Sequence, residues 1–237
     1  MALEHGHGPK EIAARLDAQN DSGRLRDAIF GGIDGTVTTF AIVAGVQGAG
    51  LSAGIVVTLG LANVLADGFS MAAGNYAGIK AVADDRRRLW KVEERHVHEN
   101  PQGERDELEQ ILARKGLQGR ILQEATAMIS QDKKQWISLM MAEEYGLPPI
   151  DERPIRAAIV IFGAFVLAGM FPLLPYLIGL ADAFSWSIGI SGLTFFAIGT
   201  IKSRWSLAPW WRSGLETLLI GGVAAGLAFV VGRMFHP

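Results

Sequence analysis

Long apolar stretches alternate with short polar ones along most of this chain, and one dense polar block interrupts them. Five stretches are long and apolar enough, or nearly so, to cross a bilayer core of roughly 30 Å as helices. They run over residues 28–50, 52–79, 155–180, 183–201 and 215–231. A core helix of a soluble protein normally shows a polar face at a period of 3.6 residues, whereas residues 183–201 carry no charge at all. The pattern therefore predicts an all-α integral membrane protein with five transmembrane helices.

The polar block between the second and third apolar stretches reads as a separate helical domain. Residues 84–99 contain no helix breaker, so we expect the second transmembrane helix to continue through them. Three more helices are predicted over residues 104–115, 117–129 and 133–145, with Pro101 and Gly103 before the first, Gly116 between the first two, and Gly146 after the last. The predicted order is a tail (1–25), two transmembrane helices (26–80), a helical insert (81–153) and three transmembrane helices (154–237).

Charge and composition narrow the possible functions. The net charge of −2 provides no basic surface for nucleic acid, so we expect no nucleic-acid partner. The absence of cysteine excludes disulfides and thiolate metal sites. The 29 glycines fit a bundle in lipid, where small residues let helix backbones approach closely. Gly31, Gly35, Gly74 and Gly78 have the spacing for such contacts.

Basic residues predict the orientation of the chain in the membrane. They gather before the first span (24–26), at the start of the insert (80–91) and after the fourth span (202–212). Because cytoplasmic loops carry an excess of Lys and Arg, we expect the N-terminus and the insert to be cytoplasmic.

The first 20 residues are polar and lack the apolar core of a signal peptide. They contain His5 and His7, which could touch a metal, but we predict a disordered tail. The lack of a targeting segment favours the bacterial inner membrane over the alternative, a vacuolar membrane.

Two carboxylates, Asp34 and Asp67, lie well inside predicted spans, where a charged side chain costs about 2.5–3.5 kcal/mol on insertion scales; Glu216 stands only at the start of the fifth span. Asp34 follows Gly31 and Gly32 and precedes Gly35, so backbone carbonyls could join its carboxylate around an ion. The simpler alternative is a neutral, hydrogen-bonded aspartate near the helix start. Because such residues usually line a pathway, we favour a functional role for Asp34.

The second span carries a line of polar and sulfur side chains at helical spacing. Asn63, Asp67 and Met71 recur every four residues, and Asn75 extends the same face by one turn. Oxygen ligands alone would suit Mg²⁺ or Ca²⁺, whereas a thioether favours softer transition metals. A lone membrane methionine is usually packing, but its register with Asp67 predicts a pathway for a divalent transition metal.

The insert supplies a second group of metal-binding residue types. Glu93 and His96 are three residues apart, the spacing used by ferritin-like carboxylate sites, and Glu104 and Glu107 repeat it. Met140 and Met141 stand just before Glu144. For any single glutamate a solvated acidic surface is the simpler explanation. For the whole set, spacing leaves metal binding and a solvated surface equally open.

Taken in order, these residues resemble the vacuolar iron transporter family over residues 26–233, as a bacterial-type member. The similarity is carried by short motifs in the first three spans and the insert: Gly-Ile-Asp-Gly (32–35), Ser-Met-Ala-Ala-Gly-Asn-Tyr (70–76), Met-Met-Ala-Glu-Glu (140–144) and Pro-Leu-Leu-Pro-Tyr (172–176). The resemblance implies a homodimer that moves Fe²⁺, and often Mn²⁺, out of the cytoplasm in exchange for protons.

The resemblance also assigns roles to particular residues. It implies that the metal contacts Asp34 and Met71 in the pathway. In the insert it implies capture by Glu93, His96, Glu104, Glu107, Met140, Met141 and Glu144. Asn63 stands where the family pattern suggests a glutamate, so Asp67 is expected to take over that carboxylate role. His96 also stands where a glutamate is usual.

Three other functions fit parts of the pattern. A membrane-anchored di-iron oxidase would typically need two Glu-x-x-His motifs, and only Glu93 and His96 form one. A cation channel could use the same polar line without moving protons. A metal sensor would leave Asp34 and Asp67 unexplained. We therefore expect a transporter rather than an enzyme, with no permanent cofactor and with Fe²⁺ as cargo, alongside Mn²⁺, Zn²⁺ or Co²⁺. Its expected partners are metal ions, protons, membrane lipid and a second copy of the chain.

Overall fold

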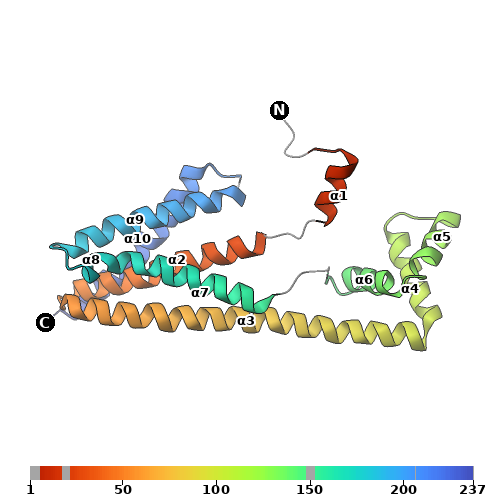
Figure 1. Cartoon of the computed structure of the whole chain (residues 1–237), viewed down its shortest axis with the longest axis horizontal. Helices are drawn as coiled ribbons and strands as arrows, with labels where there is room; N and C mark the ends of the chain where they lie inside the picture. Colours follow the sequence, from red (N-terminus) through yellow and green to blue (C-terminus); the bar gives the residue numbers. More distant parts are fainter. Residues whose placement is uncertain (1–5, 18–21, 148–152, 206, 237) are drawn as a thin grey trace. The chain divides into compact units, whose positions relative to one another are not determined.

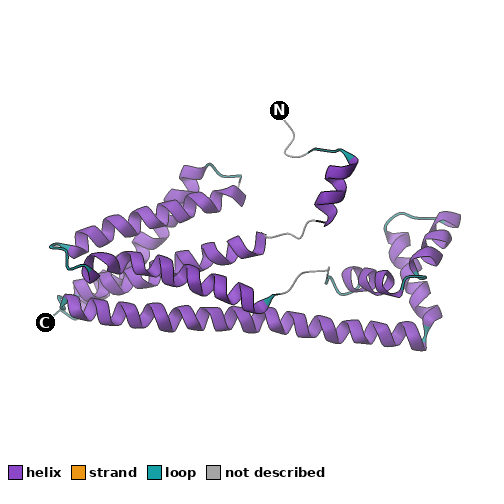
Figure 2. Cartoon of the chain, in the orientation of Figure 1, coloured by secondary structure: helices purple, strands orange, loops and turns teal. Residues whose placement is uncertain are grey.

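The computed structural model describes residues 6–17, 22–147, 153–205 and 207–236. All regular secondary structure in these ranges is helical (Figure 2). The elements are α1 (Pro9–Asp17), α2 (Ser22–Gly48), α3 (Ala53–Glu99), α4 (Pro101–Arg114), α5 (Gly119–Ile129), α6 (Lys133–Glu143), α7 (Pro154–Met170), η1 (Phe171–Leu173), α8 (Leu174–Leu177), α9 (Ala183–Lys202), η2 (Ser203–Trp205) and α10 (Trp210–Met234).

Within the described residues, five helical segments are long and apolar enough to cross a membrane, which confirms the predicted fold class. They are residues 25–48, 53–99, 154–177, 183–202 and 210–234. The fifth helix begins at Trp210, earlier than predicted, because it starts directly after Pro209, whose missing N–H and fixed φ suit a helix entry. The third was predicted as one helix to residue 180. Instead it breaks after Met170 and continues as η1 and α8, with Pro172 and Pro175 at the start of these two short elements.

The chain forms two compact units (Figure 1). The membrane unit comprises Met1–Tyr76 and Pro154–Pro237, and the insert unit comprises Ala77–Arg153. Helix α3 contributes its first part to the membrane unit and the rest to the insert unit, which agrees with the predicted continuation of the second span.

Helix α2 is the centre of the membrane unit and packs against α7, α9 and α10. Its glycines make the contact with α7 possible. A methyl group at Gly31 would lie 2.5 Å from the Ile161 carbonyl oxygen, and one at Gly35 would overlap the carbonyl oxygen of Phe165. The predicted role of these two glycines in close packing is therefore confirmed. At Gly74 and Gly78, by contrast, an added methyl group would have no atom of the described residues within 4 Å.

Apolar side chains from several helices fill the core of the membrane unit. Phe40 of α2 and Phe195 of α9 meet there with ring centroids 6.4 Å apart, and Val64 of α3 and Leu173 of η1 join them. The break in the third span is stabilised from α9, because the Ser187 hydroxyl donates to the Pro172 carbonyl at 2.7 Å. This bond satisfies a backbone acceptor that would otherwise be costly in an apolar core.

The insert unit has its own small core of Leu108, Leu112, Trp136 and Met140. Capping fixes its helix starts, since the Asp132 carboxylate accepts from the backbone N–H groups of Lys134 and Gln135. Gly116, with φ +95°, forms the turn between α4 and α5. The helices α4, α5 and α6 follow the predicted ranges to within a few residues.

The N-terminal segment differs from the prediction of a disordered tail. Residues Pro9–Asp17 form α1, with proline at its start. The Glu11 carboxylate accepts from the Gly8 N–H at 2.9 Å, which satisfies one of the free donors at the helix start. His5 lies outside the described residues.

Candidate metal centre

Three predicted ligands meet in the insert unit at the junction of α3 and α4. One ligand atom from each of Glu93, His96 and Glu104 lies within 4.8 Å of the other two. Glu93 and His96 lie one turn apart near the end of α3. Asn100 then caps α4 by accepting from the Gly103 N–H at 3.2 Å, so that Glu104 in the first turn of α4 faces α3. The chain reversal at Asn100 therefore assembles the cluster.

Burial makes this cluster unlike an ordinary acidic surface. The exposed fractions of Glu93 and Glu104 are only 1% and 7%. The Oε2 atom of each has no hydrogen-bond partner among the described residues. The Nδ1 atom of His96 lies 3.6 Å from Oε1 of Glu104. Buried carboxylate oxygens without partners are costly unless something satisfies them, so the two Oε2 atoms suit a bound cation.

The electrostatics of the cluster favour the same conclusion. Burial, and then repulsion from Glu93 and Glu107, raises the pKa of Glu104 to about 7, although His96 acts in the opposite direction. Partial burial of its carboxyl, and then repulsion from Glu107 and Glu93, raises the pKa of Glu144. Four glutamates thus influence one another here, and a divalent cation would relieve their repulsion.

Sequence reasoning missed Tyr145, which follows α6. Its hydroxyl donates to Oε1 of Glu93 at 2.8 Å. Burial, and then this hydrogen bond, raises the pKa of Tyr145, so that the hydroxyl remains a donor at neutral pH. The only sequence signal was its place directly after Glu143 and Glu144, because residues 52 positions apart give no local pattern.

The predicted thioethers are buried rather than exposed to solvent. Met140 is fully buried in the core of the insert unit, and Met141 has an exposed fraction of 1%. Met140 therefore contributes to the core packing of the insert unit. Glu107 is half-buried on α4 and Glu144 follows α6, and both interact electrostatically with the cluster.

The membrane unit brings part of the second predicted site together. The Asn63 amide of α3 donates to the Thr38 hydroxyl of α2 at 3.4 Å, and that hydroxyl donates to the Asp34 carbonyl at 2.9 Å. Asp34 is half-buried, and the carboxylate of Asp67 acts on it electrostatically. The carboxylates of Asp34 on α2 and Asp67 on α3 thus repel one another, and a cation would offset that repulsion.

The remaining residues of the predicted line continue along α3. Met71 and Asn75 are both partly buried, and Asn75 Nδ2 has no hydrogen-bond partner among the described residues. Asp67 is exposed in the single chain. The polar line is therefore only partly covered by the other helices of this chain.

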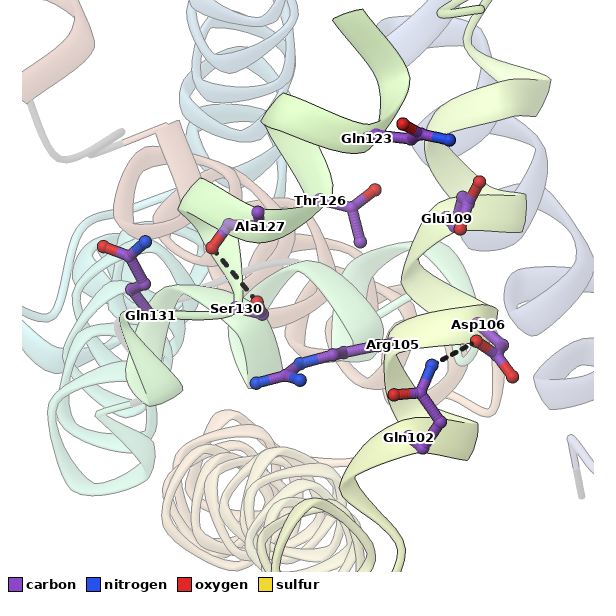
Figure 3. Close-up of a pocket in the computed structure, with 9 residues that line it drawn as sticks. All are labelled: Gln102, Arg105, Asp106, Glu109, Gln123, Thr126, Ala127, Ser130 and Gln131. Atoms are coloured by element: carbon purple, nitrogen blue, oxygen red, sulfur yellow. Dashed lines mark hydrogen bonds between the residues drawn. The ribbon is translucent and has the colours of Figure 1, made fainter. Parts of the chain in front are cut away.

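The insert unit also has a shallow polar pocket between α4 and α5, with a volume of about 350 Å³. Arg105 extends across it toward Ser130, and Gln102 donates to Asp106 at 2.8 Å (Figure 3). The pocket is lined by Gln102, Arg105, Asp106, Glu109, Gln123, Thr126, Ala127, Ser130 and Gln131. None of the predicted metal ligands lines it, so it lies outside the candidate centre.

Comparison with known proteins connects these features to one family. The VIT family model matches residues 25–233. Vacuolar iron transporter 1 of Arabidopsis thaliana is 33% identical over 213 residues, covering 89% of this chain and 85% of the relative. The vacuolar iron transporter of Toxoplasma gondii is 35% identical and covers 90% of this chain and 74% of its own. Protein CCC1 of Saccharomyces cerevisiae is 29% identical, with shares of 86% and 67%. These relatives are eukaryotic, so the expectation of a bacterial-type member is not borne out.

Proposed function

This chain belongs to the VIT family, and we propose that it exports Fe²⁺ from the cytoplasm in exchange for protons. The family and the relatives are transporters, so the di-iron oxidase alternative is set aside. Mn²⁺ is proposed as a second cargo, with Zn²⁺ and Co²⁺ as further candidates. The observation that carries the proposal is the pair of carboxylates inside the membrane spans, Asp34 on α2 and Asp67 on α3, which act on each other electrostatically.

The transport step is proposed to centre on these two aspartates. A metal ion between them would offset both their mutual repulsion and the cost of a charge in the membrane. Asn63, linked to α2 through Thr38, would hold the two helices in register. Met71 and Asn75 continue the same face and would contact the ion as it moves, the thioether favouring a transition metal over Ca²⁺.

The insert unit is proposed to capture metal before transport. Glu93, His96 and Glu104 would bind it, since their ligand atoms already converge. Glu107 and Glu144 would add negative charge that raises the local cation concentration. The resemblance adds Met140 and Met141 as thioether ligands, although Met140 also packs in the core.

Proton exchange is proposed to drive release. A proton arriving from the far side would neutralise Asp34 or Asp67, and the weakened site would release the metal there. In this scheme the N-terminus and the insert are cytoplasmic. The exposed Asp67 supports a homodimer, since a second copy would cover the open side of the polar line. The names of the relatives favour a vacuolar membrane over a bacterial inner membrane.

Reconstitution tests whether the protein transports metal at all. Purified protein in lipid vesicles should admit Fe²⁺, detected by a fluorescent chelator inside, and Asp34→Asn should lose the uptake while keeping its thermal unfolding profile. Wild-type uptake rates in the Asp34→Asn protein would refute the proposed pathway. Asp182→Asn, in the loop before α9, is the matched control and should transport normally.

A further inference from the structure

We propose that Tyr145 determines the metal selectivity of the insert cluster by holding Glu93 as a one-oxygen ligand. This inference deepens the proposed function and rests on its claim that Glu93, His96 and Glu104 bind metal. Tyr145 itself is a positioning residue, because it acts on the metal through Glu93.

The two oxygens of Glu93 have different surroundings. Oε1 accepts the hydrogen bond from the Tyr145 hydroxyl at 2.8 Å. Oε2 is buried and has no hydrogen-bond partner among the described residues. With Oε1 engaged, the carboxylate offers one fully available oxygen to a metal. Glu93 is only 1% exposed, so solvent does not compete for the Tyr145 bond.

The position of Tyr145 is fixed by the turn that ends α6. Gly146 adopts the left-handed region at φ +67°, and the Leu147 N–H donates to the Met141 carbonyl at 2.9 Å. Met141 is buried, which anchors this turn to the insert unit. The tyrosine therefore approaches Glu93 from a fixed backbone, and the hydrogen bond is made before any metal arrives.

One-oxygen binding by Glu93 discriminates between classes of cation. Ca²⁺ takes six to eight oxygen ligands and commonly uses both oxygens of a carboxylate. First-row transition metals accept imidazole nitrogen and need fewer ligands. A cluster with His96 and a restricted Glu93 thus suits Fe²⁺ or Co²⁺. Without the Tyr145 hydroxyl, Oε1 becomes free and the cluster gains a second oxygen that Ca²⁺ can use.

The test compares two metals in the full-length protein. Calorimetric titration with Co²⁺, a redox-stable stand-in for Fe²⁺, and with Ca²⁺ gives a ratio of affinities. We expect Tyr145→Phe to shift that ratio toward Ca²⁺ by about tenfold or more. Tyr176→Phe removes a buried hydroxyl of α8 that lacks a partner among the described residues, and should leave the ratio unchanged.

A second variant separates this inference from the proposed function. In a Glu93→Gln background, Tyr145→Phe should no longer alter the ratio, since the proposed effect runs through the Glu93 carboxylate and not through Glu144, with which the Tyr145 hydroxyl also interacts. Three results would overturn the selectivity role of Tyr145: an equal loss of affinity for both metals in Tyr145→Phe, an unchanged ratio of affinities, or a shift in the ratio that persists without Glu93. If Glu93→Gln leaves wild-type Co²⁺ binding intact, the proposed metal cluster itself is wrong, and the role of Tyr145 falls with it.

Discussion

Replacing Glu104 tests how strongly the buried carboxylates of the cluster destabilise the insert unit when no metal is added. Its carboxylate is buried and is repelled by Glu93 and Glu107, and its pKa rises from the ordinary value of 4.5 to about 7. The folded insert unit therefore binds this proton more tightly than the unfolded chain does. The contribution of Glu104 to the stability of the insert unit is fully present below pH 4.5, declines as the pH rises, and is lost above about pH 7.

The size of the effect follows from the same values. A shift from 4.5 to about 7 corresponds to about 3 kcal/mol of differential stability, at 1.36 kcal/mol per pKa unit. Glu104→Gln keeps the shape of the protonated side chain and removes the charge. At pH 8 and without metal, the variant should therefore stabilise the insert unit by up to about 3 kcal/mol. At pH 5 the two proteins should differ little, because wild-type Glu104 is then mostly protonated.

Hydrogen exchange resolved by mass spectrometry measures this locally in the full-length protein. Amides of α4 and α6 should exchange up to about a hundredfold more slowly in Glu104→Gln at pH 8, after correction for intrinsic rates. With saturating Co²⁺ the wild type should instead exchange more slowly than the variant, since only the wild type retains the Glu104 carboxylate as a metal ligand. Faster exchange in the metal-free variant at pH 8, or an equal difference at pH 5, would show that the Glu104 carboxylate does not destabilise the cluster.

Three further predictions concern metal linkage, the pathway and the bundle. Co²⁺ at a hundred times its dissociation constant should stabilise the insert unit by about 2.7 kcal/mol, measured by the same exchange, and Glu93→Gln should remove the effect; undiminished protection in Glu93→Gln would place the metal elsewhere. Asp67→Asn should slow Fe²⁺ flux at least tenfold in vesicles, whereas Asp182→Asn should not, and equal rates would show that Asp67 has no part in the pathway. Gly35→Ala should destabilise the bundle by about 1–3 kcal/mol, because its methyl group would overlap the Phe165 carbonyl. Gly163→Ala is the control, because a methyl group there meets free space. Equal thermal unfolding of the two variants would contradict the close packing of α2 on α7.

The sequence predicted the architecture because the bilayer imposes a simple rule on length and polarity. Residues 183–201 have no charge, and the structure has α9 there with nearly the same bounds. The ends of the helices were harder to predict, because they depend on local contacts. The break after Met170 needs Ser187 from another helix to satisfy the Pro172 carbonyl, and no periodic pattern indicates such a bond.

The candidate metal centre was predictable only where spacing along one helix determines proximity. Glu93 and His96 lie one turn apart, so their pairing follows from sequence. The approach of Glu104 depends on the reversal at Asn100. The contact of Tyr145 with Glu93 joins residues 52 positions apart and depends on the packing of α6, so it required the structure.

Proton-driven accumulation of metal distinguishes an exchanger from a channel. Vesicles containing the wild-type protein, acidic inside and with Fe²⁺ or Mn²⁺ outside, carry an internal pH dye. Proton exchange predicts that metal accumulates above its outside concentration while the interior becomes more alkaline, and that a protonophore abolishes the accumulation. Metal entry that stops at equal concentrations, with no change in internal pH, would contradict exchange and identify the protein as a channel.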